Sequence, residues 1–132
     1  MKYVLDTNTL IYFFRGQGKV ADNLWQHTPQ EIYIPAIVLF ELNVGIAKST
    51  SPEKRRRQLQ SLIEVVSILP FGQPEAQKAA EIRAELENQG TPIGPYNILI
   101  GATAIANQAV LVTHNTDEFS RILQLKIEDW YE

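Results

Sequence analysis

Four short apolar runs separated by helical patterns are the feature that most constrains the fold of this chain. The runs lie at residues 3–5, 32–34, 67–69 and 110–112. Strands that alternate with helices in this way pack as a parallel sheet between two helical layers. The sequence therefore predicts an α/β protein with three layers, α/β/α, and a mainly parallel sheet of four to five strands, with residues 125–127 supplying a fifth, edge strand.

Length and composition limit the classes of protein to consider. A chain of 132 residues predicts one domain, residues 1–132, with one core. The absence of cysteine excludes disulfides, thiolate metal sites and a thiol nucleophile. No apolar run is long enough to cross a bilayer, so we expect a cytoplasmic protein without membrane association. The net charge of −3 argues against a generally basic nucleic-acid binder but is compatible with a local basic rim, and the basic run at 54–57 is expected to be a solvated helix face.

The segment from residue 93 to residue 108 predicts a buried helix with a polar beginning. Pro95 suits the first helical position because its missing N–H would be unpaired there in any case. Asn97 then lies in the first turn, followed by apolar and small residues on nearly all sides. The Asn97 side chain is therefore expected either to cap the helix or to point into a crevice.

Glu41 stands out in the helix predicted at residues 37–48, after the second strand. Its spacing from Ile37, Val38, Val44 and Gly45 indicates that it shares their apolar face. A carboxylate on a buried face is costly unless it is paired, binds a metal or opens into a site. We therefore expect Glu41 to be functional.

Three other polar residues are expected at the same end of the sheet as Glu41. Asp6 follows the first strand, Glu118 follows the fourth, and Asn97 begins the helix that leads into the fourth. Ligands of parallel sheets bind beyond the carboxyl ends of the strands. Each residue has a structural alternative, since Asp6 can cap a helix and Asn115 with Glu118 fits a capping box, but their coincidence at one rim favours a site.

Three carboxylates and a carboxamide favour a hard cation, Mg²⁺ or Mn²⁺. Mg²⁺ held by carboxylates usually keeps waters and binds substrate phosphates, which indicates phosphodiester hydrolysis by an activated water. His114 follows a strand as a lone histidine and is assigned no catalytic role.

Several motifs together resemble a VapC toxin, a PIN-domain ribonuclease of a type II toxin–antitoxin pair. The resemblance runs from end to end and rests on Leu-Asp-Thr-Asn at 5–8, Phe-Glu-Leu at 40–42 with Gly45, Pro-Ile-Gly-Pro-Tyr-Asn at 92–97, Val-Thr-His-Asn at 112–115 with Glu-Phe at 118–119, and Glu-Asp-Trp at 128–130. It implies an Mg²⁺-dependent endoribonuclease that forms a homodimer, is inhibited by a VapB antitoxin and meets operator DNA only through the antitoxin complex. The segments at 94–96 and 114–116 resemble members that cut initiator tRNA at the anticodon loop.

The resemblance also implies roles for individual residues. Asp6, Glu41 and Glu118 match acidic positions of the family, which act in catalysis and metal binding. The supporting residues implied by the same motifs are Thr7, Asn8, Thr113 and Asn115.

Asn97 departs from the family pattern, in which an aspartate is the second principal metal ligand. An amide keeps the shape and one acceptor oxygen but loses the charge, so we expect impaired metal binding and catalysis. Because every other motif residue is present, an engineered substitution is favoured over a natural variant that is slow or silent.

Two alternatives to an active ribonuclease follow from the sequence. A catalytically silent PIN-fold module would still sequester the antitoxin and co-regulate its operon. A phosphoryl-aspartate protein is disfavoured, because a phosphatase of that kind would need an aspartate where Asn8 stands, and a receiver would need a lysine near residues 113–115.

Overall fold

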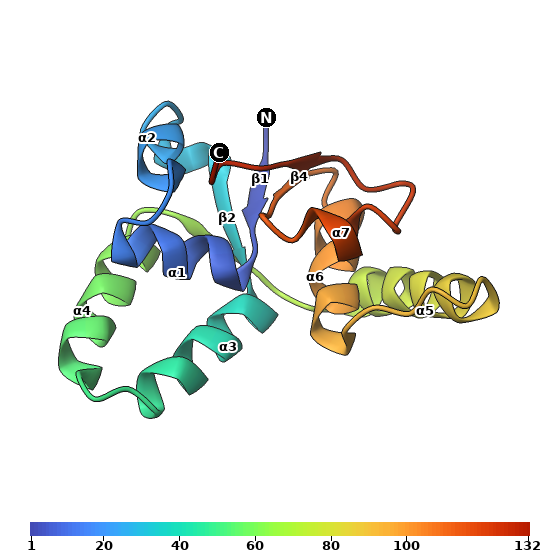
Figure 1. Ribbon diagram of the computed structural model, residues 1–132, viewed down its shortest axis with the longest axis horizontal. Coiled ribbons are helices and arrows are strands. Elements are labelled where there is room, and N and C mark those ends of the chain that lie inside the picture. The colour runs from blue at the N-terminus through green and yellow to red at the C-terminus, as the bar shows by residue number, and fades with distance from the viewer.

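A computed structural model describes residues 1–132 and shows a five-stranded sheet with helices on both sides (Figure 1). All strands are parallel, in the spatial order β3-β2-β1-β4-β5. The strands are β1 (Tyr3–Leu5), β2 (Ile32–Pro35), β3 (Ser67–Leu69), β4 (Val110–Val112) and β5 (Ile127–Glu128). The predicted three-layer α/β/α fold is confirmed.

The helices fall into two groups on either side of β1 and β2 in Figure 1. One group contains α1 (Thr7–Arg15), α2 (Val20–Leu24), α3 (Ala36–Ala47) and α4 (Pro52–Ile63), and the other contains α5 (Gln73–Asn88), α6 (Pro95–Ala106) and α7 (Thr116–Phe119). A short 3₁₀ turn at Pro29–Glu31 leads into β2. None of these helices has the length and apolar composition needed to cross a membrane.

The strand order places a switch point at the centre of the sheet. The chain builds outward from β1 through β2 to β3, and then returns to the other side of β1 with β4 and β5. The backbone N–H of Asp6 donates to the carbonyl of Val112 at 3.2 Å, so the ends of β1 and β4 are joined directly. Crevices in open parallel sheets form at such points.

The core consists of the central strands and the inner faces of the helices. Val4, Leu5, Leu111 and Val112 are fully buried. Helix α6 is buried along most of its length, as predicted, and Pro95 is its first residue. Because α6 is packed in the core, the direction of its first turn is fixed.

The fifth strand lies two residues later than predicted. It comprises Ile127–Glu128. Leu125 lies before the strand in a turn, where its backbone N–H donates to the carbonyl of Ile122 and its side chain is buried. The apolar character of Leu125 thus reflects core packing and not strand pairing.

Candidate active site

Asp6 is buried where the carboxyl ends of β1 and β4 meet, at the point of the sheet where a crevice is expected. It precedes α1 as its N-cap, and its Oδ1 accepts a hydrogen bond from the backbone N–H of Thr9 at 2.9 Å. Its Oδ2 accepts a hydrogen bond from the hydroxyl of Thr113, just beyond β4, at 2.6 Å. Only 4% of Asp6 is exposed. The capping role expected for Asp6 is confirmed and involves Oδ1, while Oδ2 is held by Thr113.

Burial raises the pKa of Asp6, and the nearby charge of Glu41 raises it further. The hydrogen bonds from Thr113 and Thr9 lower this pKa and oppose the effect of burial. Ionised Asp6 therefore carries a desolvation cost that a cation in the crevice would offset.

Glu41 reaches the crevice from α3, but not from the face predicted for it. The buried stripe of α3 consists of Val38, Leu42 and Ile46, whereas Glu41 is half-buried and Val44 is exposed. Because α3 is apolar on nearly every side, the spacing of apolar residues did not identify its inner face. The Glu41 carboxylate accepts a hydrogen bond from the hydroxyl of Thr7 at 2.7 Å, which holds it beside the start of α1.

Glu118 and Asn97 face each other across the crevice. The Oε1 atom of Glu118 accepts a hydrogen bond from the backbone N–H of Gly94 at 2.8 Å and one from the Asn97 amide nitrogen at 3.3 Å. The Gly94 hydrogen bond is the main reason that the pKa of Glu118 is lowered, and the side chains of Asn115 and Asn97 add to it. The Asn97 amide therefore helps to stabilise the ionised form of Glu118.

Asn115 joins the two sides of the crevice. Its side-chain amide donates to Oε2 of Glu118 at 3.4 Å, and its oxygen caps α7 by accepting from the Glu118 N–H. Its backbone N–H donates to the Thr113 hydroxyl at 2.9 Å, and Thr113 in turn donates to Asp6. A hydrogen-bonded chain thus runs from Asp6 to Glu118 and on to Asn97.

Asn8 is not part of this chain of hydrogen bonds. It lies on α1 two residues after Asp6, where the helical rotation turns its side chain to solvent. Sequence reasoning missed two donors that do take part, the N–H of Thr9 and that of Gly94. Both residues donate through the backbone N–H, which nearly every residue type has, so the sequence does not reveal them.

Hydrogen bonds link Asp6 to Glu118 through Thr113 and Asn115, and Glu41 is close enough for its charge to raise the pKa of Asp6. The only set of three acidic or histidine residues with ligand atoms mutually within 4.8 Å is His114, Asp129 and Glu132, near the C-terminal end of the chain. In this set His114 Nδ1 lies 2.9 Å from Asp129 and its ring stacks on Tyr131.

The donors around the crevice fit a hard divalent cation. All are oxygens: the carboxylates of Asp6, Glu41 and Glu118 and the amide oxygen of Asn97. Because the three carboxylates are not packed together, some of them would reach a cation through water, as is usual for Mg²⁺.

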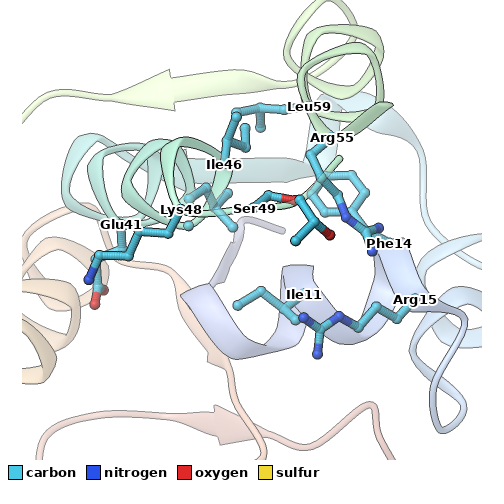
Figure 2. Close-up of a pocket in the computed structure, with 12 residues that line it drawn as sticks. Ile11, Phe14, Arg15, Glu41, Ile46, Lys48, Ser49, Arg55 and Leu59 are labelled. Atoms are coloured by element: carbon cyan, nitrogen blue, oxygen red, sulfur yellow. The ribbon is translucent and has the colours of Figure 1, made fainter. Parts of the chain in front are cut away.

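A groove of about 400 Å³ begins at Glu41 and runs between α1, α3 and α4 (Figure 2). Its floor is apolar, and the side chains of Arg15, Lys48 and Arg55 lie around it. None of these three cations belongs to an ion pair of the structure. The basic run at 54–57 is therefore not wholly a solvated face, since Arg55 is half-buried and lines the groove.

Comparisons with known proteins agree on one family. The model of the PIN domain matches residues 3–123. The tRNA(fMet)-specific endonuclease VapC of Salmonella typhimurium is 35% identical over 130 residues, which cover 98% of this chain and 98% of that protein.

Solved structures give the same result. The chain is similar to VapC in the DNA-bound VapBC complex of Salmonella typhimurium, with a TM-score of 0.91, 35% identity and 98% coverage of each chain. It is also similar to VapBC2 of Rickettsia felis bound to a promoter DNA fragment, with a TM-score of 0.89, 36% identity, and coverage of 98% of this chain and 99% of that one.

Proposed function

The chain belongs to the PIN-domain family and, within it, to the VapC ribonuclease toxins of toxin–antitoxin pairs, and we propose that its crevice is an Mg²⁺-dependent endoribonuclease site for tRNA. The observation that carries the proposal is the hydrogen-bonded chain that links Asp6, Glu118 and Asn97 at the switch point of the sheet. PIN-domain ribonucleases generally use divalent metal ions. We propose further that residues 1–132 form a single PIN domain that acts in the cytoplasm.

The proposed roles follow from the contacts of each side chain. Asp6 would be the main anchor of the cation, because Thr9 and Thr113 fix both of its oxygens. Glu41, oriented by Thr7, and Glu118 would hold it directly or through water. When bound, Mg²⁺ (or Mn²⁺) supplies charge neutralisation at the phosphate and activation of a water molecule.

Asn97 is proposed to impair this site. Its amide nitrogen donates a hydrogen bond to Glu118. This nitrogen is a donor without a free lone pair, so it cannot serve as a metal ligand. The remaining oxygen is uncharged. Loss of a ligand charge at a site held by few protein groups would weaken cation binding and slow cleavage by about 10²-fold or more.

The partner of a VapC toxin is a VapB antitoxin, and complexes of the two relatives described above are bound to DNA. We propose that this chain likewise forms a homodimer, binds a VapB-type antitoxin and contacts operator DNA only within that complex. We expect these contacts to survive the loss of charge at position 97, because they depend on the surrounding surface. A catalytically silent module that retains its antitoxin is therefore the second candidate function, and the Asn97–Glu118 hydrogen bond is the observation that favours it.

Cleavage of tRNA distinguishes the two candidates. Purified chain, its Asn97→Asp variant and the double variant Asn97→Asp/Asp6→Ala are incubated with total tRNA in Mg²⁺ and in EDTA, and products are mapped. We expect rapid, Mg²⁺-dependent cleavage only by Asn97→Asp. If the unchanged chain cleaves as fast as Asn97→Asp, position 97 is not a metal ligand. If Asn97→Asp also fails to cleave, the silent-module candidate is supported.

A further inference from the structure

Two aromatic residues that the candidate active site does not use are sequence neighbours of its residues. Phe40 precedes Glu41 on α3, and Tyr96 precedes Asn97 on α6. The two rings meet edge to face, with centroids 5.8 Å apart. They therefore join two helices that each carry a site residue.

Both rings remain largely open to solvent. Phe40 is 50% exposed and Tyr96 is 45% exposed. The inner face of α3 is formed by Val38, Leu42 and Ile46, and that of α6 begins at Ile98, so neither aromatic ring is needed for the core. An exposed aromatic pair that is not needed for the core offers a large, rigid apolar surface to a ligand.

The position of the pair favours a nucleobase as its ligand. The crevice is proposed to act on a phosphodiester bond, and the bases on either side of that bond are joined to it through one ribose each, so they must lie near the site. RNA is recognised mainly through unpaired bases that stack on aromatic side chains. The groove that begins at Glu41 carries Arg15, Lys48 and Arg55, whose charges can bind the phosphate backbone of the same strand.

We propose that Phe40 and Tyr96 form a stacking platform for an unpaired RNA base next to the bond that is cleaved. The inference rests on the proposed ribonuclease function and adds the residues that position its substrate. The base stacks on the open ring face, and this contact orients the neighbouring phosphate towards Asp6 and Glu41. The platform acts on binding and orientation and supplies no chemical group to the reaction.

Binding to the unchanged chain tests the platform separately from cleavage. The probe is a single-stranded RNA dodecamer in which 2-aminopurine replaces one base at a time, because stacking quenches its fluorescence. Phe40→Ala and Tyr96→Ala are each expected to weaken binding by about 5- to 100-fold, from the range measured for base–aromatic contacts. They should also abolish quenching at one position. Tyr96→Phe, which keeps the ring, should retain both.

Trp25→Ala is the matched control. Trp25 is 73% exposed and packs edge to face on Phe13 with centroids 6.0 Å apart, so it is an aromatic pair of the same kind away from the crevice. It should leave binding and quenching unchanged. Equal losses in Trp25→Ala and Tyr96→Ala would overturn the proposal.

Cleavage and mass measurements complete the test. In the Asn97→Asp background, Tyr96→Ala should raise KM for tRNA more than it lowers kcat. The platform is wrong if Phe40→Ala and Tyr96→Ala bind and stack the probe normally. It is also wrong if their only effect is a lower oligomeric mass in light scattering, because the pair would then contact a second copy of the chain. Failure of Asn97→Asp to cleave any RNA, with probe stacking retained, would refute the ribonuclease function and not the stacking contact.

Discussion

Replacement of Asn97 by aspartate should destabilise the metal-free protein. In the structure the Asn97 amide nitrogen donates to Glu118 Oε1 at 3.3 Å. A carboxylate oxygen at that distance would remove the hydrogen bond and place two negative charges side by side. Their repulsion is about 1 kcal/mol with the dielectric constant of water and about 5 kcal/mol with the value of 20 that suits a protein surface. Because Glu118 is half-buried and both side chains can rotate, we expect a loss of about 1–3 kcal/mol.

Thermal unfolding with and without Mg²⁺ measures this effect. For a chain of this size, 1 kcal/mol corresponds to roughly 3–5 °C in melting temperature, so Asn97→Asp should melt about 3–15 °C below the unchanged chain in EDTA at pH 7. Added Mg²⁺ should raise the melting temperature of Asn97→Asp much more than that of the unchanged chain, because only a cation that binds the native state stabilises it. An equal or higher melting temperature for Asn97→Asp in EDTA would refute the electrostatic role given to position 97.

Two further predictions concern single carboxylates of the crevice and have opposite dependence on pH. Since burial raises the pKa of Asp6, Asp6→Asn should stabilise the protein at pH 7 by about 0.5–2 kcal/mol. The gain should disappear as the pH falls below about 3.9, where aspartate is protonated in both the folded and the unfolded state. A lower melting temperature for Asp6→Asn than for the unchanged chain at pH 7 would contradict this. The pKa of Glu118 is lowered, chiefly by the Gly94 hydrogen bond, so its charge stabilises the fold above about pH 4.3 and this contribution is lost as the pH falls through the folded-state pKa. Glu118→Gln should therefore be less stable at pH 7 and converge with the unchanged chain in acid-titration melts, and a constant difference across the titration would count against it.

The sequence predicted the layout of the fold because that layout depends on residue type. Apolar runs marked the strands, and Pro95 marked the beginning of α6. Parallel strands then placed Asp6 and Glu118 at the same rim, since all their carboxyl ends point one way. These inferences need only the order of elements along the chain.

The parts that the sequence did not predict depend on tertiary packing. The inner face of α3 is determined by the elements that pack against it. Because α3 is apolar on nearly every side, the spacing of its apolar residues could not show on which face Glu41 lies. Gly94 takes part through its backbone N–H, which any residue except proline would provide. The groove around Arg55 exists only where α1, α3 and α4 meet, so the basic run alone could not distinguish its members.

The strand order has a consequence for when activity arises during synthesis of the chain. The hydrogen bond between Asp6 and Thr113 joins residues 107 positions apart, and β1 completes its parallel pairing only when β4 docks beside it. Contacts of such long sequence separation form late in folding, because the loop between them must first be closed. A ribosome-bound chain that has not yet exposed residues 110–118 therefore lacks half of its crevice. The proposed nuclease site is in this way assembled only in the finished chain, after β4 and α7 have left the ribosome.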